Sequence, residues 1–443
     1  MSQSVVTLAL VTAFMALVSL ALSSRAQTVG AFYRGENANG TAPGVWTLTL
    51  SQVTTWIFAR SIMNAAILGY FYGIGGALAY AAYYLSFLTG AQIISSLRFR
   101  HGFSSVQDFL HDRFGLAGTS TYNFVVAVRL LSEVFANLLV IGLIFGSDGS
   151  IAYIASVAIV GAVTLAYSLL GGLNASIRTD VFQMVLFLAL LAVLAVLTLA
   201  QPSFEFAAIA ASTPNADNAG WVLLAVALLQ VWSYPLHDPV MMDRGFIADR
   251  KTTITSFHYA AVISTICILA FGIIGVWAGL EKQDGESLVP TLTRLLGDWP
   301  MLAFNAALLI SCMSTLDSTY ASAAKLTIYD MRMGRATVMN GRIAMAMFLI
   351  GGLAMVYLGS KDLFGAVAVS GTASMFLAPV IFFSLWGGVR DIPVWSYLTA
   401  FAAAMLAAAA YFTESSGYTN LIAPWSGLEH KYSKLLLLSA GTL

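Results

Sequence analysis

Runs of about 20 apolar residues recur along the whole of this chain, and this feature leaves few folds open to it. A helix of that length crosses the hydrocarbon core of a bilayer. Of the 443 residues, 59% are hydrophobic and 9% are charged, whereas soluble domains carry about 25% charged residues. We therefore expect an all-α polytopic membrane protein that has the lipid bilayer as a partner. The formal net charge of zero gives no indication of a nucleic-acid partner.

The apolar runs predict about 12–13 transmembrane helices. They are expected near 4–23, 46–72, 74–97, 117–146, 150–170, 178–200, 219–240, 256–280, 300–327, 341–358, 363–388, 393–413 and 432–443. The last run is short for a span and fits either a shortened final helix or an interfacial one. The first run, Val5–Leu22, could be a signal peptide. However, no basic residue precedes it and Ser-Ser-Arg follows it, which favours a retained first helix.

Arginine and lysine follow an alternating pattern between these runs, which predicts the orientation. With the N-terminus outside, most basic residues fall in cytoplasmic loops, for example Arg98, Arg100, Arg244 and Arg250. The pattern predicts a multi-pass protein of the cell membrane, either a plasma or an inner membrane.

Two blocks of five helices, 46–200 and 219–388, divide the predicted transport domain, which takes up residues 1–443 as a single unit. Residues 4–23 form an extra N-terminal helix, and 393–443 form C-terminal helices. Each block opens with an interrupted helix: polar residues break the first from Gln52 to Arg60, and Pro235 to Pro239 break the second. Paired interruptions of this kind indicate the binding site of a transporter with inverted repeats.

Hydroxyl groups cluster in the apolar stretch between about 301 and 328. Ser311, Ser314 and Thr315 are three and four residues apart, so they share one helical face. Neutral oxygens arranged in this way suit a small hard cation such as sodium. Alternatively, the hydroxyls bond to the carbonyls one turn back, as serine and threonine often do in membrane helices.

A loop and helix start in the middle of the chain resemble those of a known family. Tyr167-Ser-Leu-Leu-Gly-Gly, followed by Thr179-Asp180 and Gln183, resembles the pattern of the sodium:solute symporter family. The segment 104–115 is similar to a cytoplasmic loop of that family, and Ser314-Thr-Leu-Asp-Ser318 resembles its eighth core helix. The resemblance implies a LeuT-like fold, with an inverted five-plus-five helix repeat and an extra N-terminal helix. It also implies sodium-driven solute uptake.

The resemblance also implies an ion site. Ser314 and Thr315 match side-chain sodium ligands, and Ser311 matches a backbone-carbonyl ligand. Thr54 and Ile57 match the carbonyl ligands of the first core helix. Asp180 matches an acidic residue near the inward exit of the ion, although an acid favoured by a helix dipole would also fit there. Sodium is the coupling ion and the only metal expected, and no cofactor is expected.

The chain departs from the family at two places that bear on the solute. Trp56 stands where some relatives carry Asp in the break of the first core helix. Asp238-Pro-Val-Met-Met-Asp-Arg244 replaces a Gln-rich segment. The identity of the solute therefore does not follow from the resemblance.

Four ionisable residues are predicted within spans: Arg60, Arg129, Glu133 and Asp317. A charge at the centre of a span costs about 2.5–3.5 kcal/mol on insertion scales, so each charge needs a partner or water. Arg129 and Glu133 can pair along one helix, either for structure or for binding. Arg60 could hold a substrate carboxylate, or it could pair with Glu133 or Asp317. Asp317 points away from the ion face and is expected to be structural.

Polar and aromatic residues flank both breaks, namely Ser61, Asn64, Trp232 and Tyr234. They suit a small polar organic solute, although helix packing explains each of them equally well.

The residues together predict a secondary active transporter that couples sodium entry to uptake of a small polar organic solute. Arg60 favours a carboxylate-bearing solute such as an amino acid. A transporter-like sensor and a proton-coupled symporter using Glu133 or Asp180 remain alternatives. The sequence shows no phosphate-binding glycine loop or nucleophile elbow, and we do not expect an enzyme.

Overall fold

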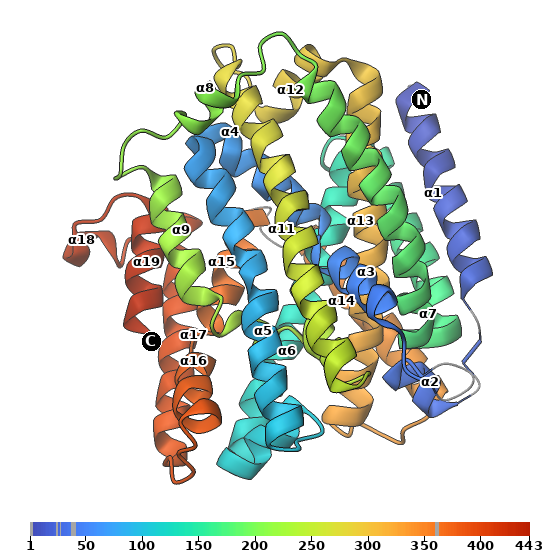
Figure 1. Cartoon of the computed structure of the whole chain (residues 1–443), viewed down its shortest axis with the longest axis vertical. Helices are drawn as coiled ribbons and strands as arrows, with labels where there is room; N and C mark the ends of the chain where they lie inside the picture. The colour runs from blue at the N-terminus through green and yellow to red at the C-terminus, as the bar shows by residue number, and fades with distance from the viewer. Residues whose placement is uncertain (1–2, 24, 27, 37–40, 359–362) are drawn as a thin grey trace.

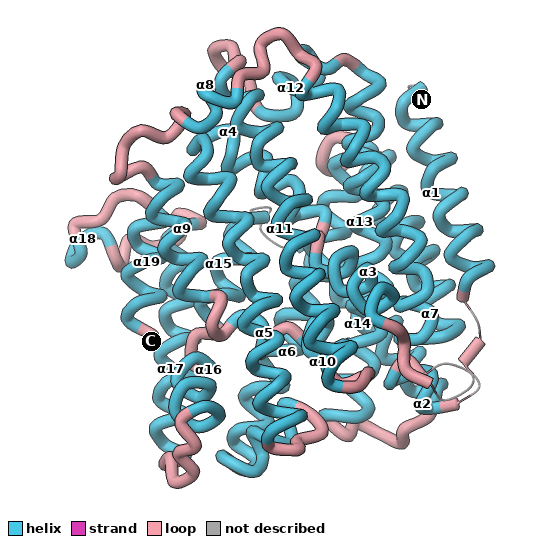
Figure 2. The backbone as a smooth tube through the Cα atoms, viewed as in Figure 1, coloured by secondary structure: helices cyan, strands magenta, loops and turns pink. Residues whose placement is uncertain are grey.

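The structure, a computed structural model, describes residues 3–23, 25–26, 28–36, 41–358 and 363–443. All regular secondary structure in these residues is helical, and no strand is present among them. Most of the long helices run side by side in a common direction (Figures 1 and 2). The all-α prediction is therefore correct.

The first helices in chain order are α1 (Gln3–Leu22), α2 (Val29–Arg34), α3 (Val45–Trp56), α4 (Ala59–Ala82), α5 (Ser86–Ile94), α6 (Val106–Phe145) and α7 (Ile151–Leu199). Those that follow are α8 (Phe206–Ala210), α9 (Ala219–Gln230), α10 (Pro239–Gly245), α11 (Arg250–Leu280), α12 (Leu288–Leu296) and α13 (Asp298–Lys325). The last group is α14 (Val338–Leu358), α15 (Leu363–Ala373), α16 (Leu377–Pro379), α17 (Val394–Ser415), α18 (Ala423–Ser426) and α19 (Lys431–Gly441).

Eight continuous helical stretches of the described chain are long and apolar enough to cross a membrane. The number is smaller than the predicted 12–13 partly because two of these stretches each contain two helices joined across a kink. Ala59–Arg100 is kinked at Gly73 (φ 63°), and Ile151–Leu199 is kinked at Gly172 (φ 57°). Glycine adopts this left-handed backbone without the penalty that a side chain would bring. At Gly73 the chain turns back on itself, because a Cβ atom added at Gly76 would lie 2.1 Å from the Leu68 carbonyl oxygen. The predicted division between helices 150–170 and 178–200 is present as the kink at Gly172, and the second helix begins directly after it, earlier than predicted.

Both predicted interruptions are present. α3 ends at Trp56 and α4 begins at Ala59, so Ile57 and Phe58 form the first break. α9 ends at Gln230, a 3₁₀ turn covers Tyr234–His237, and α10 begins at Pro239. Proline at the first helical position needs no backbone N–H there, which suits a restart at this point. At these two breaks, buried backbone groups lie outside regular α-helix.

α4 and α11 approach each other closely through small residues. A Cβ atom added at Gly275 would lie 2.0 Å from the carbonyl oxygen of Ala66, and one added at Gly69 would lie 2.2 Å from that of Gly272. Glycines at such a crossing allow two membrane helices to pack backbone to backbone. This contact fixes the helix that follows the first break.

The final apolar run forms α19, whose 11 residues extend about 16 Å, too short to cross the hydrocarbon core. α19 packs against α9 and α17. The fully buried Ser439 hydroxyl of α19 accepts a hydrogen bond from Gln230 Nε2 at 3.1 Å. The C-terminal helix is thus tied to the second break.

Candidate ion and solute site

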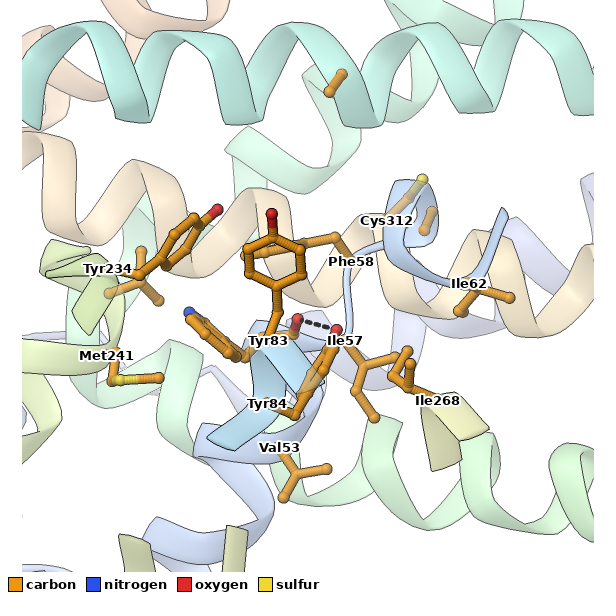
Figure 3. Packing of buried hydrophobic residues seen from close by; sticks show 14 of the residues in the cluster. Val53, Ile57, Phe58, Ile62, Tyr83, Tyr84, Tyr234, Met241, Ile268 and Cys312 are labelled. Atoms are coloured by element: carbon orange, nitrogen blue, oxygen red, sulfur yellow. Dashed lines mark hydrogen bonds between the residues drawn. The ribbon is translucent and has the colours of Figure 1, made fainter. Parts of the chain in front are cut away.

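The first break lies directly against the hydroxyl face of α13. The Ser311 hydroxyl donates a hydrogen bond to the carbonyl of Ile57, and both residues are buried. Figure 3 shows Ile57 and Phe58 in the break, with Tyr83, Tyr84 and Tyr234 around them. The register predicted for Ile57 therefore brings its carbonyl to α13, and Thr54 lies one turn earlier in the same buried segment.

The Ser314 and Thr315 hydroxyls do not bond to carbonyls one turn back. The Ser314 hydroxyl donates to Asp180 Oδ1 at 2.8 Å. Thr315 Oγ1 has no hydrogen-bond partner among the described residues, and its side chain is fully buried. By contrast, Thr319 on the same helix donates to the Thr315 carbonyl at 2.7 Å, the ordinary pattern. A buried hydroxyl without a partner costs about 1–3 kcal/mol, which a bound cation would offset.

Asp180 connects this hydroxyl face to a buried arginine. Its Oδ2 atom accepts from Arg244 Nη2 at 3.0 Å and from the Ser51 hydroxyl at 2.6 Å. Asp180 lies seven residues beyond the restart of α7 at 173, past the first turn in which a helix dipole acts. The dipole explanation for Asp180 is therefore not supported.

Arg244 is a functional candidate that the sequence reading missed. We placed it in a cytoplasmic loop, but it is fully buried in α10. Its Nε donates to the Ser51 hydroxyl at 2.8 Å, and its Nη2 donates to the Ser318 hydroxyl at 2.9 Å. The interaction partners of Arg244 lie on α3, α7 and α13. The signal available in the sequence was its position after the second break, six residues past Asp238.

Asp317 faces α7 and not the ion face. Its carboxylate accepts from the Ser176 hydroxyl at 3.0 Å and from the Thr179 hydroxyl at 2.9 Å. It does not pair with Arg60. This arrangement agrees with the structural role expected for Asp317.

A small cavity of about 20 Å³ lies between the two breaks, with room for about one water molecule. It is lined by Trp56, Phe58, Arg60, Ser61, Tyr80, Tyr83, Tyr84 and Tyr234. Three of the candidate solute residues, Arg60, Ser61 and Tyr234, are therefore here. The sequence reading missed the tyrosines of the Tyr80–Tyr84 segment, although three tyrosines within five residues of a span are visible in the sequence.

Two other candidates lie away from this cavity. Trp232 is 36% exposed, and its ring packs against Phe382 and Trp386, at centroid distances of 5.6 and 6.3 Å. Asn64 is buried in α4, and its Nδ2 has no partner within the described chain. Trp232 and Tyr234 are separated by a non-helical turn, so their proximity in sequence does not bring them to one face.

Four buried charges form a network beside the cavity. Glu133 pairs with both Arg60 and Arg129, and Arg129 Nη2 also lies 2.9 Å from Asp238 Oδ2. The Trp56 indole N–H donates to the same Asp238 oxygen at 2.9 Å. Both guanidinium groups lie over the Phe58 ring, 5.0 and 5.5 Å from its centroid. Arg60 therefore takes the pairing alternative with Glu133, and Asp238 completes a network whose formal charges cancel.

Comparison with known proteins supports the resemblance over the first half of the chain and the fold over its whole length. The model of the sodium:solute symporter family matches residues 38–243, which include the first break, Asp180 and the second break. The whole fold is similar to that of a Na⁺-coupled sialic acid symporter in its substrate-bound outward-open state. That match has a TM-score of 0.72 and 15% identity, and it covers 100% of this chain and 97% of the other. The resemblance to the sodium:solute symporter family, with a LeuT-like fold, is therefore confirmed.

A second solved structure agrees on the fold, and a curated relative matches part of the sequence. A nucleobase-cation-symport-1 family transporter in a closed conformation gives a TM-score of 0.58 at 14% identity, covering 92% of each chain. A curated relative, the putative sodium-dependent multivitamin transporter of Drosophila melanogaster, is 27% identical over 146 residues. That match takes in 32% of this chain and only 24% of the relative.

Proposed function

We propose that this protein is a secondary active transporter that couples inward sodium movement to the uptake of a small polar organic solute by alternating access. The family resemblance and the LeuT-like fold support this class. The observation that carries the proposal is the convergence of oxygens where α13 meets the first break. There, Ser311 contacts the Ile57 carbonyl, and Thr315 has a buried, unpartnered hydroxyl.

In this proposal, the carbonyls of Thr54, Ile57 and Ser311 and the hydroxyls of Ser314 and Thr315 hold the ion. Five neutral oxygens suit sodium, a hard cation that prefers oxygen ligands. Asp180 bonds to Ser314 and supplies a negative charge beside the site. Bound sodium would link α3 and the first break to α13 and stabilise one arrangement of the bundle, which raises solute affinity by a reciprocal coupling energy of about 1–3 kcal/mol.

The charged network favours a solute with no net charge. Arg60 and Arg129 are already balanced by Glu133 and Asp238. An anionic solute would leave an unpaired charge in a buried site, which is costly. A zwitterion such as an amino acid could exchange its carboxylate with Glu133 at Arg60 and still leave the network neutral. The cavity of about 20 Å³ must open further to admit it.

The test is the thermal stability of the purified protein against a library of small solutes, in sodium and in potassium. A ligand that binds only the folded state raises the melting temperature by mass action. We expect sodium alone to raise the melting temperature, and one class of polar solutes to raise it further only in sodium. A solute that acts equally in both salts would contradict sodium coupling and favour the proton-coupled or sensor alternative.

The ion assignment is tested by the double substitution S314A/T315A. We expect it to abolish the sodium-dependent shift and sodium-stimulated uptake in proteoliposomes. Ser264→Ala is the matched control, because it removes a fully buried hydroxyl that bonds to the Ala260 carbonyl of α11. An unchanged sodium response in the double variant would refute the assignment.

A further inference from the structure

A second and larger cavity is lined in part by Arg129, which pairs with Glu133 in the charged network. It has a volume of about 460 Å³, within the range of about 300–1,000 Å³ typical of ligand pockets. Helices α6, α14, α15 and α17 form its walls, and apolar side chains such as Phe124, Phe135, Met405 and Phe412 make up most of its lining. Nothing in the proposed transport cycle uses this cavity.

The cavity opens onto the surface that faces lipid. Phe124 is 56% exposed and Val128 is 52% exposed, and both lie on the membrane-spanning part of α6. On the facing wall, Ala409 is exposed on α17, which is also long and apolar enough to span the bilayer. The hydrocarbon of a bilayer around these spans would therefore be continuous with the interior of the cavity.

The length of the cavity matches one leaflet. Its lining residues run from Phe124 to Phe135 on α6 and from Met405 to Ser416 on α17. Eleven residue steps along a helix extend about 16 Å, and half of the hydrocarbon core is about 15 Å thick. Ser415 and Ser416 add polar groups at one end of the α17 wall. An apolar chain with a polar head at one end fits this distribution.

We propose that this cavity binds one acyl chain of a membrane phospholipid, inserted sideways between α6 and α17. An acyl chain outside the cavity lies in bilayer hydrocarbon and not in water. The shape of the cavity and the polar groups at its end therefore decide whether an acyl chain occupies it. The cavity is therefore a site for a bilayer lipid and not for the transported solute.

The inner wall of this lipid site touches groups that hold the second break. Ser370 lines the cavity, and its hydroxyl lies 3.0 Å from His237 Nε2. Arg129 also lines it, and its guanidinium binds Asp238. His237 and Asp238 belong to the break between α9 and α10. An acyl chain that supports this wall would therefore stabilise the arrangement of the break, which makes the transport rate sensitive to lipid.

The proposal is tested with the full chain in phosphatidylcholine vesicles that contain a small fraction of phosphatidylcholine with a photoreactive diazirine in its acyl chain. We expect cross-linked peptides to concentrate on 124–135 and 405–416. Val128→Trp and Ala409→Trp, on opposite walls, should each reduce that labelling several-fold. Leu406→Trp is the matched control, because Leu406 is 71% exposed on α17 and does not line the cavity.

Labelling spread evenly over lipid-facing helices, or unaffected by both tryptophan variants, would overturn the proposal. Exclusion of the label by a second copy of the chain, seen as cross-linked dimers joined at α17, would overturn it as well. A cooperative thermal melt of each variant, at a temperature close to that of the parent, confirms that it is folded. Because this readout needs no transport, its failure is distinguishable from failure of the proposed symport.

Discussion

The guanidinium of Arg244 and the carboxylate of Asp180 form a fully buried ion pair, 3.0 Å apart, between α10 and α7. The second oxygen of the same carboxylate accepts from Ser314, a proposed sodium ligand, at 2.8 Å. The Asp180 carboxylate therefore connects the positive charge of Arg244 to Ser314, a proposed ligand of the ion. Sodium binding and the position of α10 should depend on each other through Asp180.

We predict that Arg244→Gln destabilises the protein strongly. Removing one partner of a buried ion pair leaves the other charge uncompensated, at a cost of about 3–5 kcal/mol. Thermal melts in sodium and in potassium measure this effect. The double substitution R244Q/D180N should be more stable than R244Q alone, because it removes the orphaned charge. If the single variant melts like the parent, the pair does not stabilise the bundle.

Glu133→Gln should be more damaging than Arg60→Gln. Glu133 pairs with two arginines, so its removal leaves two positive charges against Asp238 alone, whereas removal of Arg60 leaves Arg129 able to balance Glu133 in part. We expect a lower melting temperature for Glu133→Gln and a shift of solute preference toward anions. The solute library described above measures both. An unchanged solute preference would argue that the network is purely structural.

Gly275→Ala should separate α4 from α11. The added Cβ would lie 2.0 Å from the Ala66 carbonyl oxygen, and backbone cannot move aside as a side-chain tip can. Overpacking of this kind costs about 1–3 kcal/mol or more. Thermal unfolding measures it, and Gly44→Ala is the control, because nothing lies within 4 Å of a Cβ at Gly44. Equal melting of the two variants would show that the helices tolerate a wider spacing.

Glu286, in the loop between α11 and α12, should stay ionised at unusually low pH. Hydrogen bonds from Arg294, followed by one from the Gln283 backbone N–H, lower its pKa from 4.5 to about 2. Because the pKa is lower in the folded state, the stabilisation is complete above about pH 4.5 and is lost as the pH falls toward 2.

Hydrogen exchange of the 281–297 segment checks this prediction. The parent should be better protected than Glu286→Gln at pH 7 and pH 4, and the difference should disappear near pH 2. A difference that persists unchanged at pH 2 would show that the carboxylate charge is not its cause.

The helical fold and the breaks could be predicted because they depend on local patterns. Runs of apolar residues mark the spans, and Pro235 and Pro239 mark the second break. The shared face of Ser311, Ser314 and Thr315 could be predicted as well, because their spacing is itself a helical geometry; that this face binds an ion stays a proposal. Here the sequence and the structure describe the same side of one helix.

The partners of the buried charges could not be predicted in the same way. Arg244 was assigned to a loop because arginine near the end of a span normally marks the cytoplasmic side. Only the folded chain shows that α3, α7 and α13 converge on it. Asp238 was noted as a departure from the family, but its contacts with Trp56 and Arg129 join positions 182 and 109 residues apart.

The neutrality of the Arg60, Arg129, Glu133 and Asp238 network has an electrical consequence. If the solute also carries no net charge, sodium is the only uncompensated charge that crosses the membrane in each cycle. A membrane potential of 100 mV then contributes about 2.3 kcal/mol per sodium ion to accumulation, and none of it acts on the solute. Solute uptake would generate a current. The membrane voltage would set the accumulation ratio of the solute by acting on sodium and not on the solute itself.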